Sequence, residues 1–108
     1  MGKAPDALIR VSTGFGGGMG SSHEETCGVL TGAIIALAAV QGRITPDDPG
    51  DALKARIQTM RERFAAHFGA TRCDTIRLAL PDVEGRCMRT VREGARLIAE
   101  FLREEGLL

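Results

Sequence analysis

With 108 residues, the chain is long enough for a single domain, residues 1–108, with a real core. Its 14 basic and 14 acidic side chains balance, so no net field favours a nucleic acid or an anionic membrane surface. It contains no Trp, no Tyr and only four Phe, which argues against a surface that stacks on bases. No nucleic-acid partner is therefore expected.

The first half of the chain predicts two helices separated by glycines. Residues 5–12 have the character of the end of a helix, and Gly14 stops it. A glycine-rich loop follows. Ser22 with Glu25 three residues later forms a capping-box pattern, which predicts a helix from there to Gly42.

This second helix is expected to be the buried centre of the molecule. Its apolar segment from Cys27 to Val40 spans about fourteen residues, fewer than the roughly 20 that cross a bilayer, so no membrane span is expected. Gly28, Gly32 and Ala36 recur at every fourth position and give a narrow face where another backbone can approach closely.

A turn with two prolines over residues 43–50 leads to an amphipathic helix of about 18 residues that ends at Gly69. Its apolar stripe consists of Leu53, Ile57, Met60, Phe64 and Phe68.

A short helix is expected to start within residues 71–74 and to stop at Pro81, and Asp82 is expected to cap a last helix that reaches about Glu105. One face of the last helix carries Val83, Cys87, Val91, Ile98 and Leu102. Apolar stripes of this kind are shielded from water only when the helices pack on one another. The sequence therefore predicts an all-α bundle of about four helices, with the glycine-rich loop before the central helix.

Three cysteines are the candidates for chemistry. No two of them form Cys-x-x-Cys, which excludes a thioredoxin-type dithiol and a c-type haem attachment. Met1-Gly2-Lys3 is not followed by the apolar segment of a signal peptide, so a reducing cytoplasm is expected. There, thiols are reactive, ligating or simply buried more often than joined in structural disulfides.

Each cysteine is expected near the start of a helix, where free N–H groups favour a thiolate. Cys27 is the strongest candidate, although the carboxylates of Glu24 and Glu25 oppose its ionisation. Cys73 follows a basic residue, and Cys87 is on the apolar face of the last helix, which turns its sulfur inward. The competing interpretation is three small buried residues, since free Cys is among the most buried types. We expect the three to converge on one site.

The sequence resembles the C_GCAxxG_C_C family of redox-active proteins in three features. They are the loop Gly-Phe-Gly-Gly-Gly-Met-Gly at residues 14–20, the motif Cys-Gly-Val-Leu-Thr-Gly at 27–32, and the later Cys73 and Cys87. The chain has Val29 where that motif has Ala, and it lacks the first of the family's four cysteines, which lies in a helix upstream of the loop. The resemblance implies a redox or metal–thiolate role.

Two functions follow as hypotheses. In thiol–disulfide exchange with a redox partner protein, Cys27 would attack and Cys73 or Cys87 would resolve the intermediate. In the alternative, the three thiolates bind zinc or an iron–sulfur cluster without turnover, and His23, water or a second chain completes the shell. His23 is the local candidate because it is one helical turn before Cys27.

The glycines suggest a loop that passes close to the thiols, anchored in the core by Phe15 and Met19, with backbone amides that hydrogen-bond sulfur or a cofactor. A phosphate cradle is the weaker alternative, because the loop lacks the Gly-Lys-Ser/Thr ending and no strand precedes it. The backbone expected to face a cofactor is that of Gly16, Gly17, Gly18 and Gly28.

A homo-oligomer is also expected. Without the upstream helix of the family pattern, part of the face through Gly28, Gly32 and Ala36 would lack its partner, and exposed apolar patches usually mark an interface. A two-fold dimer is the commonest way to cover such a face. In the alternative, residues 1–12 fold back over it.

Overall fold

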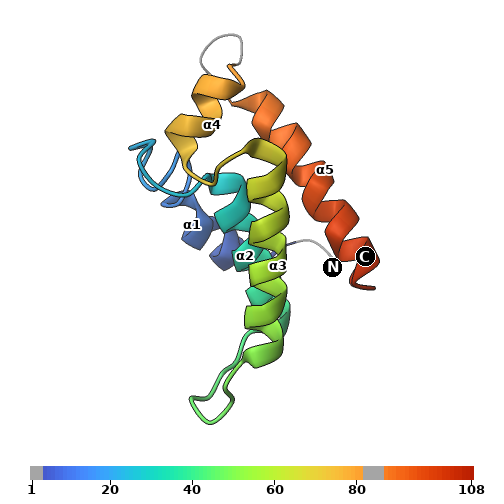
Figure 1. The fold of residues 1–108 in the computed structure, drawn as a ribbon. Coiled ribbons are helices and arrows are strands. Elements are labelled where there is room, and N and C mark those ends of the chain that lie inside the picture. The colour runs from blue at the N-terminus through green and yellow to red at the C-terminus, as the bar shows by residue number, and fades with distance from the viewer. Residues whose placement is uncertain (1–3, 82–86) are drawn as a thin grey trace.

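The structure is a computed structural model that describes residues 4–81 and 87–108. Within these residues the protein is all-helical, as predicted, and its only β-pairing is one isolated bridge. The described residues form five helices, two of them short, against the expected four or so (Figure 1). They are α1 (Asp6–Thr13), α2 (Gly28–Gln41), α3 (Asp51–Phe68), α4 (Cys73–Ala79) and α5 (Met88–Glu104).

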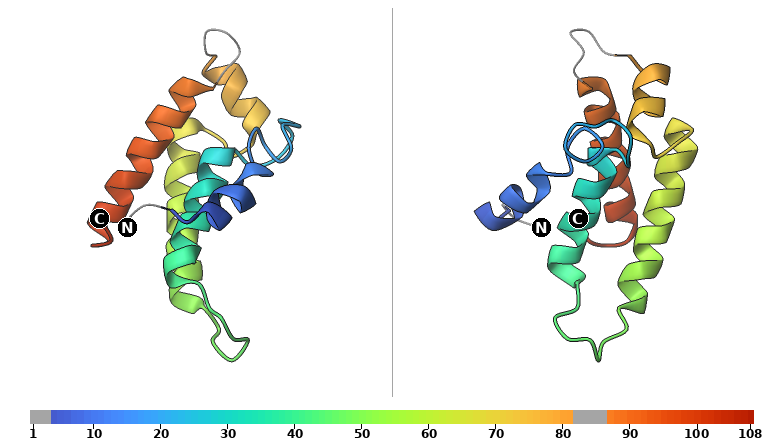
Figure 2. Two further views of the ribbon diagram at one scale, coloured as in Figure 1. Left: turned by 180° about the vertical axis from the view of Figure 1, so that it is seen from behind. Right: turned by 90° about the vertical axis from the view of Figure 1, so that its left-hand side faces the viewer.

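The helices pack around α2, which contacts α1, α3 and α5, while α3 also contacts α5. Helices α2 and α3 form an antiparallel hairpin, and α5 leans across them (Figure 1). The glycine-rich loop, α4 and the start of α5 lie at the same end of the molecule, and α1 projects to one side (Figure 2). Among the described residues, no helix combines the length and the apolar character needed to cross a bilayer.

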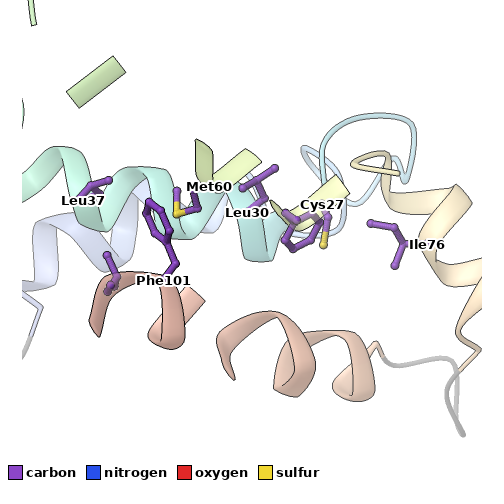
Figure 3. Packing of buried hydrophobic residues seen from close by; sticks show 8 residues of the cluster. Cys27, Leu30, Leu37, Met60, Ile76 and Phe101 are labelled. Carbon is purple, nitrogen blue, oxygen red and sulfur yellow. The ribbon is translucent and has the colours of Figure 1, made fainter. Parts of the chain in front are cut away.

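The core lies between α2, α3 and α5 and extends toward α4, as Figure 3 shows. The predicted stripe of α3 is confirmed, since two of its members are fully buried and the other three pack against the core cluster. The largest fully buried side chains of the core are Phe64, Leu30, Leu37, Met60 and Ile76.

The predicted capping box is wrong, because α2 begins at Gly28, and its N-cap residue, Cys27, makes no side-chain capping bond. The Ser22 hydroxyl instead donates to the carbonyl of Gly18 at 2.6 Å. His23 has a left-handed φ of 62° and so lies outside any helix. Backbone pairing between the residues before α2 and those before α4 replaces the local cap.

The predicted face of α5 is confirmed in its second half, where Leu102 is buried and Ile98 packs against the core, but not in its first half. Val91 is 37% exposed, whereas Thr90 and Gly94 are buried. A Cβ atom on Gly94 would lie 2.6 Å from Cγ1 of Val29, so α5 approaches α2 more closely there than a larger residue permits. That contact turns the Thr90 side of the helix inward. The expected cap Asp82 and the stripe residue Val83 lie outside the described residues.

Residues 4–81 and 87–108 cover the small-residue face of α2 closely only at its start. A Cβ atom on Gly28 would come within 3.2 Å of the Cα of Gly16 in the glycine-rich loop, so close approach is confirmed there. At Gly32 an added Cβ would meet no atom within 4 Å, and Ala36 is exposed. Helix α1 does pack against α2, but no residue of α1 is fully buried.

A candidate thiol site beneath the glycine-rich loop

The three cysteines lie at the N-termini of three different helices. Cys27 is the N-cap of α2, Cys73 is the first residue of α4, and Cys87 is the N-cap of α5. All three line one cavity of about 440 Å³. None is in a disulfide. The convergence expected from the sequence is therefore present in the structure, and we call this cavity the thiol pocket.

A short antiparallel pairing, centred on Thr26 and Arg72, places two of the cysteines next to each other. Side chains alternate between the faces of such a pair, so Cys27 and Cys73 share the face opposite to Thr26 and Arg72. Both cysteines are buried, at 6% and 4% exposed. Three backbone bonds hold the pairing: Cys27 N–H to Thr71 O at 2.7 Å, Cys73 N–H to Glu25 O at 2.8 Å, and Asp74 N–H to His23 O at 2.8 Å.

The glycine-rich loop covers this pair with an unusual backbone. Residues 17–21 all have left-handed φ values, between 58° and 70°. A Cβ atom on Gly18 would lie 2.7 Å from the Cβ of Cys73 and 3.0 Å from the carbonyl oxygen of Glu25, so only glycine fits there. Met19 and Ser21 adopt the same conformation at a cost of about 1–2 kcal/mol each. The strained backbone lies directly on the thiols, which is typical of functional sites.

The loop's anchoring is only partly as predicted. Phe15 is partly buried, but Met19 is 45% exposed and does not enter the core. Met19 lies in the run of left-handed residues, with a φ of 62°. Instead, internal backbone bonds hold the loop: the N–H groups of Met19, Gly20, Ser21 and His23 donate to Phe15, Gly14, Gly16 and Gly17.

Those four amides are therefore occupied, which argues against a phosphate cradle built on them. Gly16, Gly17 and Gly28 do line the thiol pocket, and Gly18 lies against Cys73. Their assignment as the backbone that faces a cofactor stays a prediction.

Electrostatics at Cys27 oppose the expectation of a thiolate. Burial raises the pKa of this thiol, and the backbone N–H groups of Val29 and Leu30 lower it by less. A negative charge on Cys87 raises the Cys27 pKa further. The sequence correctly indicated that backbone amides at the helix start would lower the pKa of Cys27. It did not show how deeply the thiol is buried, and burial raises the pKa by more. Cys27 is therefore held as a neutral thiol at pH 7.

Cys73 follows the same pattern. Burial raises its pKa, a charge on Cys27 or Cys87 raises it further, and the Arg77 guanidinium lowers it. Arg72, the expected activator, instead pairs with the carboxylate of Asp74 at 2.8 Å on the surface. The cation that acts on Cys73 is thus one turn further along α4.

Cys87 differs from the other two because it is partly exposed. One turn further along α5, Thr90 also lines the thiol pocket, with its side chain fully buried. The sequence analysis missed Thr90 and Arg77 as pocket residues. Its spacing of three residues from Cys87 could have indicated Thr90, but the expected stripe placed Val91 at the buried position instead.

The predicted metal ligands do not form a metal centre as placed. His23 is in the loop rather than one helical turn before Cys27, so the expected i, i+4 pair is absent. Within residues 4–81 and 87–108, no three His, Cys, Asp or Glu side chains form a group that could hold a metal ion. As the structure places them, these donors therefore do not fit zinc or an iron–sulfur cluster.

The fold and the site define a small all-helical protein with three free thiols in one pocket under a glycine-rich loop. The family model described as "Putative redox-active protein (C_GCAxxG_C_C)" matches residues 1–101, and the chain belongs to this family. No curated protein and no solved structure matches the chain.

Proposed function

We propose that the protein carries out thiol–disulfide exchange with the three cysteines of the thiol pocket. One observation carries the proposal: three free thiols from three helices line a single pocket, in a chain whose family is described as redox-active. A reducing cytoplasm, where free cysteines persist, is the compartment that this proposal assumes.

The exposures favour Cys87, rather than Cys27, as the attacking residue. A disulfide can approach Cys87 because it is partly exposed, whereas Cys27 and Cys73 are buried. The Cys87 thiolate attacks one sulfur of the substrate disulfide, whose S–S bond breaks as a mixed disulfide forms. The departing thiolate takes a proton from water. Cys27 or Cys73 then loses its proton and attacks Sγ of Cys87, which releases the second half of the substrate as a thiol.

The exposures of the three cysteines give the two steps an order. The substrate meets Cys87 first because Cys87 is partly exposed. The buried thiols of Cys27 and Cys73 then act on a disulfide that is already attached to Cys87 at the same pocket. Overall, two protein thiols are oxidised to a disulfide and one substrate disulfide is reduced to two thiols.

Single Cys→Ser variants and intact-protein mass spectrometry test this sequence of steps. The reduced wild-type protein should consume one small disulfide and lose two thiols. Cys87→Ser should react at least tenfold more slowly, and loss of the resolving cysteine should trap a mixed disulfide on Cys87. Three equally unreactive thiols would rule out exchange. A bound metal or a coloured centre in protein purified without oxygen would favour the metal–thiolate alternative instead.

A further inference from the structure

The thiol pocket holds a polar group that the exchange mechanism does not use. The side chain of Thr90 is 2% exposed, and its Oγ1 has no hydrogen-bond partner among the described residues. Buried hydroxyls are almost always hydrogen-bonded, so a buried hydroxyl without a partner among the described residues needs an explanation. Because Thr90 lines the pocket, a group that enters the pocket is well placed to supply the missing bond.

The surroundings of Thr90 indicate the chemistry of that group. Cys87, the N-cap of α5, precedes Thr90 by three residues, and both residues line the pocket. Arg77 is the charged side chain of the described lining, and its charge reaches the thiols, since it lowers the pKa of Cys73. The neighbouring walls are apolar, formed by Val29 and Ile76. A positive charge and a hydroxyl donor beside a thiol suit a carboxylate attached close to a sulfur.

We propose that the thiol pocket binds a low-molecular-weight disulfide that carries a carboxylate within a few bonds of its sulfur. Its sulfur lies at Cys87, and its carboxylate accepts a hydrogen bond from Thr90 Oγ1 in the field of Arg77. The assignment of this ligand as a substrate rests on the exchange function proposed above.

A small molecule fits the pocket better than a protein disulfide does. The volume of about 440 Å³ is within the range of small-molecule sites. Thr90, at 2% exposed, is within reach only of a group that enters the pocket completely. In the exchange step, Cys87 attacks the sulfur nearest to it, the carboxylate-bearing half stays bound as a mixed disulfide, and the other half leaves as a thiolate and is protonated by water. Attack by a buried thiol on Cys87 then releases the bound half.

Binding is tested without chemistry in the Cys87→Ser protein, by calorimetry with two matched probes. The probes are 3,3′-dithiodipropionate, which has the carboxylates, and bis(2-hydroxyethyl) disulfide, which is neutral. The carboxylate probe should bind at least tenfold more tightly. Adding Thr90→Val or Arg77→Gln should each weaken its binding by about tenfold, because each removes a bond or charge on an ionised group. Thr90→Ser should retain binding, since it keeps the hydroxyl.

Thr59→Val is the matched control, because the Thr59 hydroxyl is exposed on α3 and bonds to the carbonyl of Ala55. It should leave the affinity unchanged. Equal affinity for the two probes, or no effect of Thr90→Val, would overturn the proposal.

Exchange by the wild-type protein separates this proposal from the function on which it rests. If Thr90-dependent binding is found in the Cys87→Ser protein but the wild type oxidises with neither probe, the binding site stands and the exchange function fails. If the wild type reacts equally fast with both probes, or only with a protein disulfide, exchange stands and the carboxylate site is wrong.

Discussion

At the scale of single residues, the site is governed by a competition at each thiol between burial and the groups around it. Burial is the largest effect at Cys27 and Cys73, and it raises the pKa of both. Helix-start amides at Cys27 and the Arg77 charge at Cys73 act the other way but more weakly. A position at a helix N-terminus therefore does not by itself make a reactive thiolate. The depth of burial decides whether the thiol ionises.

The first prediction concerns alkylation rates. In the reduced protein at pH 7.5, iodoacetamide should modify Cys87 at least tenfold faster than Cys27 or Cys73, because the two buried thiols are neutral and shielded. Peptide mapping after timed quenching measures the three rates, and the same protein in denaturant should show similar rates at all sites. Fastest modification of Cys27 in the native protein would restore that residue as the attacking thiol.

The second prediction concerns alkaline pH. The folded-state pKa values of Cys27 and Cys73 lie above the ordinary value of 9.0, so the unfolded chain loses these protons first as the pH rises. The contribution of these two protonated thiols to the free energy of unfolding is complete below about pH 9. It is lost as the pH rises through the folded-state pKa values. Urea unfolding under reducing conditions should thus give a lower free energy of unfolding at pH 9.5 than at pH 7.5. This decrease should be smaller in a Cys27→Ala, Cys73→Ala double variant. A decrease of the same size in that variant would show that other titrating groups cause it.

At the scale of elements, the sequence predicted a helix best where that helix's own pattern determined its packing. The α3 stripe repeats at three- and four-residue spacing, and its expected length of about 18 residues matches Asp51–Phe68. The start of α2 was wrong because the local Ser22–Glu25 pattern lost to pairing with residues before α4, about 45 positions away. The first half of the α5 face was wrong at Val91, because the close approach of Gly94 to Val29 is a contact between helices that the sequence pattern does not show.

The third prediction tests that contact. Gly94→Ala would place a Cβ atom 2.6 Å from Cγ1 of Val29, a β-branched side chain that has little freedom to rotate in a helix. Overpacking costs about 1–3 kcal/mol, which outweighs the roughly 0.5–1 kcal/mol that alanine gains over glycine within a helix. Chemical denaturation should therefore show a net loss of stability.

Gly32→Ala is the matched control for Gly94→Ala. A Cβ atom on Gly32 would meet no atom within 4 Å, so only the gain in helix propensity remains. This variant should be more stable than the wild type by about 0.5–1 kcal/mol. Equal effects of the two substitutions would show that α2 and α5 do not approach as closely as the structure indicates.

At the scale of the whole molecule, the sequence predicted that the three thiols meet but not how. The sequence indicated helix starts and the family motif. The pairing of Thr26 with Arg72, and a buried Thr90 hydroxyl that has no partner among the described residues, exist only in the assembled fold. Such features depend on contacts between segments that carry no pattern of their own. The predicted all-α class was confirmed because it depends on periodicity alone.

The molecule also leaves an apolar groove of about 350 Å³ between α1 and α2. The groove is where the small-residue face of α2 stays uncovered, and α1 covers it only in part. Its apolar lining includes Leu8, Ile9, Ile35, Ala36, Ala39 and Val40. Two of these side chains, Ile9 and Val40, are 53% and 63% exposed. The fold thus keeps open the surface from which a homo-oligomer was expected.

We predict that a second copy of the chain covers this groove in a two-fold dimer, because exposed apolar grooves of this kind usually mark interfaces. Val40→Glu would bury a charge in that dimer and should shift sedimentation velocity at micromolar concentration toward the monomer, while the thermal unfolding midpoint extrapolated to low concentration stays unchanged. Ile44→Glu is the control, since Ile44 is fully exposed and outside the groove, and it should leave the dimer intact. A wild-type protein that sediments as a monomer at these concentrations would show that α1 alone is sufficient cover for α2.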